Sequence, residues 1–383
     1  MSAMKPQHAA LFEPLELGPV TLRNRVFQAP LSICYADHEG FVTREMAEHY
    51  GRRAQGGAGM VIIENLAVNV SGRQLPRQAL IAGEEHLPGL RMLAEEIKRH
   101  GAAAVVQIVH AGRYAGPWDR YEERRRLAPS AIPFPLPPDR TVTPQEITRE
   151  ELEESIAAFA NATRLAKEAG FDGVEIHGAQ GFLISSFQSP RMNRRTDGYG
   201  EDPNRFALEV VDAVVAVAGG DIAVGYHLFA DELIDGGWSL EDAAAFAPAL
   251  EGRGIDFLMP ILATFETLRH PSNEGLTSRV GFQHHAATRL QRETSIPVLT
   301  NGKLGDPDVA ARIVATGESP AVGLGRPLLA DPDWVAKVRS GVAAEIRACE
   351  CSPPLCLHTQ LTGVVCACWP EGAREAGLLG YDD

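Results

Sequence analysis

Short apolar runs recur along the chain from about residue 24 onward, and stretches with helical periodicity separate them. Several of these runs show no polar alternation, which is typical of parallel strands covered on both faces. The eight predicted strands are Val26–Ala29, Met60–Glu64, Ala104–His110, Val174–His177, Ile222–Leu228, Asp256–Ile261, Pro297–Thr300 and Ala321–Leu324. Eight strand–helix units favour an α/β fold, a closed (β/α)8 TIM barrel, over an open doubly wound sheet, because no strand is followed by GxGxxG.

The helical segments carry recognisable start signals. Apolar residues between Leu90 and Ile97 are spaced three and four apart, which predicts an amphipathic helix. Thr148 and Glu151 have the spacing of a capping box, and Asp306 followed by proline reads as an N-cap. Helices are therefore expected to begin after Thr148 and after Asp306.

Barrel enzymes carry their chemistry at the C-terminal ends of the strands, so the long segments that follow strands are informative. Ala111–Thr148 and Gln180–Arg205 are then insertions that overhang this end. We expect residues 1–340 to form the barrel and residues 341–383 to form a short cysteine-rich C-terminal extension.

Composition limits the classes of molecule that this protein is expected to bind. The formal net charge is -14 and the basic residues are scattered, which argues against nucleic acid or an anionic membrane surface. No apolar run is long enough to span a bilayer, and the N-terminus lacks the apolar stretch of a secretory signal, so the cytoplasm is the expected location. A homo-oligomer is compatible with the sequence, which leaves the oligomeric state open.

Six motifs, in order along nearly the whole chain, closely resemble the Old Yellow Enzyme family of NADH:flavin oxidoreductases. They are LFEPLELGPVTLRNRV, QAPLS, VQIVHAGR, EIHGAQGFLISSFQSPRMNRRTDGYG, LTNGK and VGLGRPLLADP. The tail, RACECSPPLCLHTQLTGVVCACWPEGAREAG, resembles the cluster-binding segment of the 2,4-dienoyl-CoA reductase and trimethylamine dehydrogenase branch. Those enzymes continue into a second, nucleotide-binding flavin region, and this sequence ends where that region would begin.

The resemblance implies FMN as the cofactor. Glycines in the loops after strands seven and eight allow backbone N–H groups to approach the phosphate, to which Arg326 can donate two parallel hydrogen bonds. The Gln107 amide can donate and accept toward the pyrimidine half of the ring. For Asn65, a buried amide satisfied by the backbone is a serious alternative. The expected FMN-binding residues are Pro30, Leu31, Ser32, Asn65, Gln107, His227, Asn301, Gly302, Lys303, Gly325 and Arg326.

By the same resemblance, His177 and Gln180 bind the oxygen of the substrate's carbonyl group, where two donors stabilise developing negative charge. Two positions depart from the family. Phe182 stands where ene-reductases commonly carry a proton-donating tyrosine, so Tyr35 becomes the expected catalytic substitute, with Tyr114 or Cys34 as alternatives. His227 stands where an arginine commonly faces flavin N1 and O2, and only a protonated imidazole restores that charge.

The tail cysteines suggest metal ligation, because five of the six cysteines lie there and disulfides are rare in a reducing compartment. The family pattern is C-x2-C-x3-C-x11-C. Cys349, Cys356 and Cys368 fall in register, whereas Ser352 occupies the second position and Cys351 lies one residue early. We expect Cys349, Cys351, Cys356 and Cys368 to bind a [4Fe–4S] cluster. Tetrahedral zinc and uncoordinated thiols are the alternatives.

The leading functional hypothesis is therefore an FMN enzyme that moves hydride between NAD(P)H and a small conjugated carbonyl substrate. The alternative is an FMN and iron–sulfur dehydrogenase or demethylase that passes electrons through the tail cluster to a partner protein. A third reading is a non-catalytic barrel that binds a ligand or another subunit.

Overall fold

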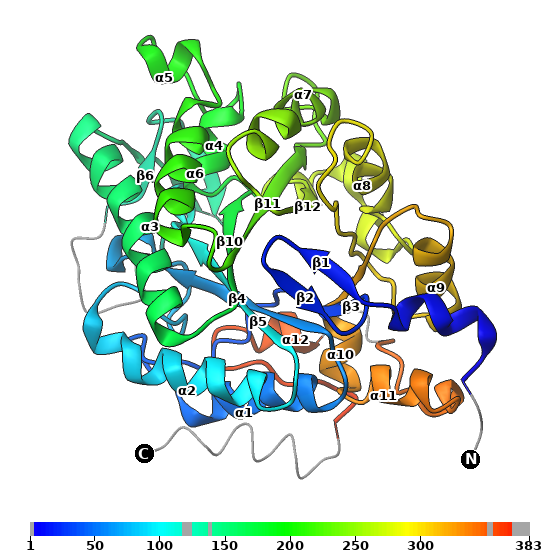
Figure 1. Ribbon diagram of the computed structural model, residues 1–383. Helices are drawn as coiled ribbons and strands as arrows, with labels where there is room; N and C mark the ends of the chain where they lie inside the picture. The colour runs from blue at the N-terminus through cyan, green and yellow to red at the C-terminus, as the bar shows by residue number, and fades with distance from the viewer. Residues whose placement is uncertain (1–3, 117–124, 137–139, 351–354, 370–383) are drawn as a thin grey trace.

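Seven parallel strands form one curved sheet in the computed structural model, which describes residues 4–116, 125–136, 140–350 and 355–369. The strand order is β12-β11-β10-β5-β4-β3-β13 (Figure 1). The strands are β3 (Val26–Gln28), β4 (Met60–Ala67), β5 (Ala103–Val109), β10 (Gly173–Gly178), β11 (Ala223–Asp231), β12 (Phe257–Leu262) and β13 (Val322–Leu324).

The segment 297–300 joins the two edges of this sheet. Val298 forms a parallel bridge to Leu258 of β12, and Thr300 forms one to Val322 of β13. The Leu299 N–H donates to the Leu258 carbonyl at 2.8 Å, and the Gly323 N–H donates to the Thr300 carbonyl at 2.7 Å. Every predicted strand position is thus occupied, and the prediction of a (β/α)8 barrel is confirmed.

Helices cover the outer face of the barrel, as Figure 1 shows. The capping box between Thr148 and Glu151 is present at the start of α3, and the Asp306 side chain caps α9, so both predicted helix starts are confirmed. The α-helices are α1 (Arg44–Gln55), α2 (Leu87–Lys98), α3 (Arg149–Ala169), α4 (Leu183–Gln188), α5 (Gly198–Glu201), α6 (Arg205–Ala218), α7 (Leu240–Glu251), α8 (His284–Leu290), α9 (Pro307–Ala315), α10 (Arg326–Ala330), α11 (Trp334–Arg339) and α12 (Leu355–His358). No helix within the described ranges is long and apolar enough to cross a membrane.

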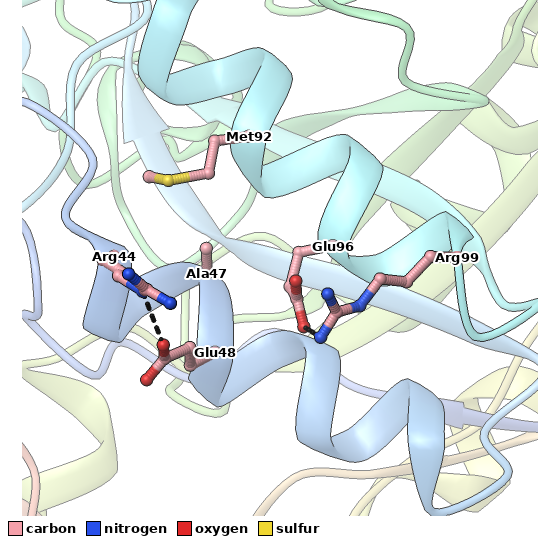
Figure 2. Close-up of a pocket in the computed structure, with 6 residues that line it drawn as sticks. All are labelled: Arg44, Ala47, Glu48, Met92, Glu96 and Arg99. Atoms are coloured by element: carbon pink, nitrogen blue, oxygen red, sulfur yellow. Dashed lines mark hydrogen bonds and ion pairs between the residues drawn. The ribbon is translucent and has the colours of Figure 1, made fainter.

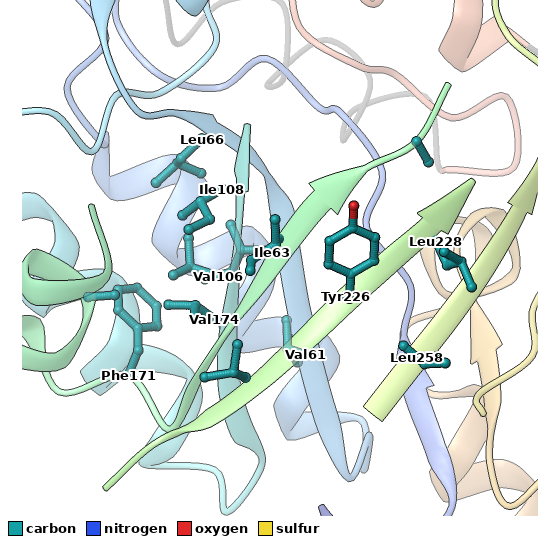
Figure 3. Packing of buried hydrophobic residues seen from close by; sticks show 14 of the residues in the cluster. Val61, Ile63, Leu66, Val106, Ile108, Phe171, Val174, Tyr226, Leu228 and Leu258 are labelled. Atoms are coloured by element: carbon teal, nitrogen blue, oxygen red, sulfur yellow. The ribbon is translucent and has the colours of Figure 1, made fainter. Parts of the chain in front are cut away.

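Side chains along each strand point alternately to the apolar core outside the barrel sheet and to the polar site inside it. Successive side chains point to opposite faces of a strand, so Val106 and Ile108 of β5 lie on the other face from Gln107. Val106, Ile108 and Val174 are fully buried in the large apolar cluster drawn in Figure 3. Burying each such side chain contributes roughly 1.5–3 kcal/mol. The apolar outer face therefore fixes the inward direction of the polar residues between them.

An N-terminal hairpin, which the sequence reading missed, closes the bottom of the barrel. Strands β1 (Leu15–Leu17) and β2 (Val20–Leu22) pair in antiparallel fashion. Leu17 and Leu22 are buried in a second cluster with Met60 and Phe257, which begin β4 and β12. The accessible end of the barrel is consequently the end at which the strands finish.

Both predicted insertions contain short elements of their own. The first holds η4 (Gly112–Tyr114), β6 (Leu127–Ala128), β7 (Phe134–Leu136), β8 (Arg140–Val142) and β9 (Gln145–Glu146), and the second holds α4 and α5. The remaining 3-10 turns are η1 (Pro6–Phe12), η2 (Val70–Gly72), η3 (Glu84–His86), η5 (Thr267–Arg269), η6 (Pro271–Asn273), η7 (Leu276–Ser278) and η8 (Ala343–Glu345).

Candidate functional site

Four polar side chains from three adjacent strands meet inside the barrel near its C-terminal end. Glu175 of β10 is in register with Gln107 of β5, and His177 of β10 is in register with His227 of β11. All four are buried. The Gln107 amide donates to the Glu175 carboxylate at 2.6 Å and lies 2.9 Å from His227 Nδ1. Two of the residues expected to bind FMN, Gln107 and His227, are thus brought into direct contact.

His177 is stacked on His227, with ring centroids 4.9 Å apart and planes 8° from parallel. Burial lowers the pKa of His177 well below its usual range, and the neighbouring His227 lowers it further. A hydrogen bond with Gln180, which has a left-handed φ of 58°, acts in the opposite direction on this pKa. The expected pair of His177 and Gln180 is therefore assembled, with a neutral imidazole.

The loop after β3 carries Pro30, Leu31 and Ser32, and a buried carboxylate holds it. Glu64 of β4 accepts the Ile33 N–H at 2.7 Å and the Cys34 N–H at 3.2 Å. Cys34 has a φ of 56°, which non-glycine residues rarely adopt. Burial raises the pKa of Glu64 to about 8, even though these two backbone hydrogen bonds act in the opposite direction. Glu64 thus fixes the path of the loop.

Asn65, the next residue of β4, has a protein partner for its side-chain oxygen. Gln78 Nε2 donates to Asn65 Oδ1 at 2.9 Å and to its backbone carbonyl at 2.7 Å. This contact supports the alternative, in which Asn65 is a buried amide with a protein partner. The partner of its side chain is the Gln78 side chain, whereas the alternative expected the backbone. The role of Asn65 toward FMN stays a prediction.

The predicted phosphate residues lie where the segment 297–300 and β13 end. Gly302 has a φ of 104°, a conformation that favours glycine, and Asn301 accepts a hydrogen bond from Gln283. A Cβ added to Gly325 would meet no atom within 4 Å, so its backbone is open to close approach. Arg326 forms no ion pair or side-chain hydrogen bond with the described residues. Lys303, in contrast, donates to the Ser278 carbonyl.

The three expected substitutes for the missing tyrosine have other partners or an unfavourable pKa. Tyr35 donates to the Val364 carbonyl at 2.5 Å, and Tyr114 donates to Glu266 at 2.7 Å. Cys34 is fully buried, and burial raises the pKa of its thiol well above the usual range. Phe182 is buried with its ring centroid 4.7 Å from that of His177. The side chain beside His177 therefore offers no proton, and a catalytic role for Tyr35 stays a prediction.

The tail packs against both loops just described. The Val364 N–H donates to the Ile33 carbonyl at 2.9 Å, and Trp369 Nε1 donates to the Leu329 carbonyl of α10 at 2.7 Å. Within the described ranges, no group of three or more histidines, cysteines or acidic residues is arranged to hold a metal ion. The thiols of Cys349 and Cys368 are not in disulfides, Cys356 is buried, and Cys351 lies outside the described residues. The predicted ligand set is thus not assembled in the described part of the tail.

Glu175 and Glu64 are site residues that the sequence reading did not single out. Each is a lone carboxylate within a run of buried apolar residues, in GVEIHG and in VIIEN. Because an ionised group is rarely buried without a partner, a single charge inside a predicted buried strand is a usable signal.

A hollow of about 270 Å³ lies elsewhere, on the outer helices α1 and α2 (Figure 2). Its charged side chains are already paired, Arg44 with Glu48 at 2.8 Å and Arg99 with Glu96 at 2.6 Å. The chemistry-bearing residues are at the barrel mouth and not in this hollow.

Known proteins match this arrangement. Residues 10–345 match the model of the NADH:flavin oxidoreductase / NADH oxidase family. The chain is 35% identical over 346 residues to an NADH oxidase of Thermoanaerobacter brockii, covering 88% of this chain and 52% of that protein. It is 36% identical over 328 residues to an NADPH dehydrogenase of Geobacillus sp. (strain WCH70), covering 85% of this chain and 92% of that protein.

The structure of 2-naphthoyl-CoA reductase in complex with 2-naphthoyl-CoA superposes with a TM-score of 0.88 at 28% identity, covering 94% of this chain and 56% of that one. The chain thus spans about half the length of several proteins that it matches. The family match extends over most of the barrel, including the strands that carry the four buried polar residues. The chain therefore belongs to the NADH:flavin oxidoreductase / NADH oxidase family, as its resemblance to the Old Yellow Enzymes implied.

Proposed function

We propose that this chain is an FMN-dependent oxidoreductase that transfers hydride between NAD(P)H and a small conjugated carbonyl compound. The observation that carries the proposal is the pairing of a neutral, buried His177 with Gln180 at the mouth of a family barrel. Family membership supports flavin redox chemistry, and the donor pair supports a carbonyl oxygen as the group bound.

The residues at the mouth fit a flavin. His227 Nε2 and Gln28 Oε1 are buried and have no hydrogen-bond partner among the described residues, so each is available to a polar ring edge. Arg326 and the open backbone at Gly325 suit a phosphate. FMN, when bound, supplies a reversible two-electron store.

His177 would act as a neutral hydrogen-bond donor. Its stacking on His227 and its contact with Phe182 restrict its ring, so little reorganisation is needed when a carbonyl oxygen gains negative charge. Gln180 supplies an amide N–H to the same oxygen. Such a pair favours carbonyl compounds in which negative charge develops on oxygen.

A dehydrogenase is the second candidate, and Phe182 favours it. A substrate that is oxidised needs no proton donor at this position, and the Tyr114 hydroxyl is engaged by Glu266. No step of either proposal passes through an iron–sulfur cluster, because the described part of the tail does not bring the ligands together. Cluster binding that includes Cys351 stays a prediction.

Anaerobic stopped-flow spectroscopy tests the proposal. Purified protein should contain FMN, NADH or NADPH should bleach the flavin band, and cyclohexenone should restore it. Bleaching by a small amine or alcohol, with no reoxidation by cyclohexenone, would favour the dehydrogenase. Protein that contains and binds no flavin would refute both.

A further inference from the structure

The buried Glu175 lies at the centre of the site, between Gln107 and His227. It is fully buried on β10, and its Oε2 lies 3.4 Å from His227 Nδ1. Its second oxygen, Oε1, has no hydrogen-bond partner among the described residues. A buried carboxylate so incompletely satisfied is costly, which indicates a function for its charge.

The two nitrogens of His227 face different surroundings. Nδ1 faces Gln107 Nε2 at 2.9 Å and Glu175 at 3.4 Å, whereas Nε2 is buried without a partner among the described residues. In the neutral ring, Nδ1 accepts from Gln107 and the proton resides on Nε2. In the charged ring, the Nδ1 proton is directed at the Glu175 carboxylate, and Gln107 no longer donates to Nδ1. Nε2 is consequently a donor in both states.

We propose that Glu175 is a positioning residue that holds His227 with Nε2–H directed at the bound flavin and stabilises its imidazolium form when the flavin is reduced. This inference rests on the proposed FMN function. Charge and hydrogen bonds near the flavin ring nitrogens tune the cofactor, and a cation favours the anionic reduced ring. The buried carboxylate thereby compensates for the absence of an arginine at position 227.

The other groups around His227 agree with a single charge at this position. Among the described residues, no carboxylate forms a hydrogen bond or ion pair with His177, whose ring is stacked on His227 at 4.9 Å. Met259 is the β12 residue in register with His227. Two adjacent imidazolium ions would repel each other, so the ring beside Glu175 takes the proton. His177 then stays neutral and keeps its role as a hydrogen-bond donor.

Redox potentiometry of the FMN-loaded protein is the first test. Glu175→Gln keeps the shape of the side chain and removes its charge. It should weaken the binding of reduced FMN at least tenfold relative to the binding of oxidised FMN, which lowers the midpoint potential by about 30 mV or more. His227→Gln should have the same effect, and adding Glu175→Gln to it should change nothing further. Glu232→Gln is the matched control, because this fully buried carboxylate accepts from Ser189 and Arg191 and contacts no histidine of the described residues.

Histidine ¹⁵N NMR provides a second readout that does not depend on the variant. In the reduced wild-type protein at pH 7, both ring nitrogens of His227 should carry a proton, whereas in Glu175→Gln only Nε2 should carry one. A neutral His227 in reduced wild-type protein would overturn the inference even where the variant does not fold. An unchanged potential in Glu175→Gln would overturn it while leaving FMN binding intact. Failure of the wild type to bind FMN would overturn the proposed function as well.

Discussion

Replacement of His177 by alanine tests the proposed carbonyl site most directly. The change removes a buried ring together with its hydrogen bond to Gln180 and its stacking on His227. Loss of one preorganised donor typically costs about 2.7–4 kcal/mol of transition-state stabilisation, or roughly 10²–10³-fold in rate. We therefore expect a loss of this size in the rate at which cyclohexenone reoxidises the reduced protein.

The assay is single-turnover stopped flow under nitrogen, with FMN content measured in the same samples. His177→Asn retains a short donor and should recover part of the rate. His110→Ala is a suitable control, because His110 is equally buried but accepts from the Gly112 N–H instead of contacting Gln180. Wild-type reoxidation rates in His177→Ala, with every enone accepted by the wild type, would remove His177 from the mechanism.

Three further predictions concern the cofactor, the proton and the fold. Arg326→Ala should release FMN with little change in thermal stability, because Arg326 is the expected phosphate partner and forms no ion pair or side-chain hydrogen bond with the described residues. Full FMN occupancy would place the phosphate elsewhere. Phe182→Tyr should accelerate reoxidation by an enone, by up to ~10²–10⁴-fold if protonation limits the rate, and an unchanged fast rate would mean that another residue delivers the proton. Burial lowers the pKa of His110 from 6.5 to about 4, so the folded state binds fewer protons and its stability should fall as the pH drops from 6.5 to 4, by about 3 kcal/mol. Denaturant titrations at pH 7 and pH 4.5 should show this loss, and His110→Gln should reduce it.

The strands and helix starts could be predicted because their signals are local. An apolar run or a capping box such as Thr148 with Glu151 lies within a few residues, and the structure agrees at each of these positions. The N-terminal hairpin was missed because its strands are three residues long, and their apolar residues are explained only by the strand ends that they cover. The segment 297–300 was predicted as a strand, and it pairs with its neighbours through two isolated bridges. Its apolar pattern does not reveal that its pairing is so limited.

The motifs predicted His177, Gln107 and His227 as candidate site residues. They did not predict Glu175, the carboxylate that contacts Gln107 and His227. Pairing of Glu175 with His227 depends on the register of β10 and β11, which no sequence spacing encodes. Tyr35 was expected to supply a proton, but its hydroxyl donates to Val364, a residue 329 positions away. Contacts of this kind arise only after the chain has closed, so composition and periodicity carry no information about them.

The docking of the tail on the two loops that are expected to bind FMN has a thermodynamic consequence. Val364 is hydrogen-bonded to the loop that continues from Ser32, and Trp369 is hydrogen-bonded to the helix that begins at Arg326. Where two binding events order the same backbone, each must strengthen the other by an equal factor. A ligand that tightens the association of the tail would therefore raise the affinity for FMN, and FMN would in turn protect the tail from proteolysis.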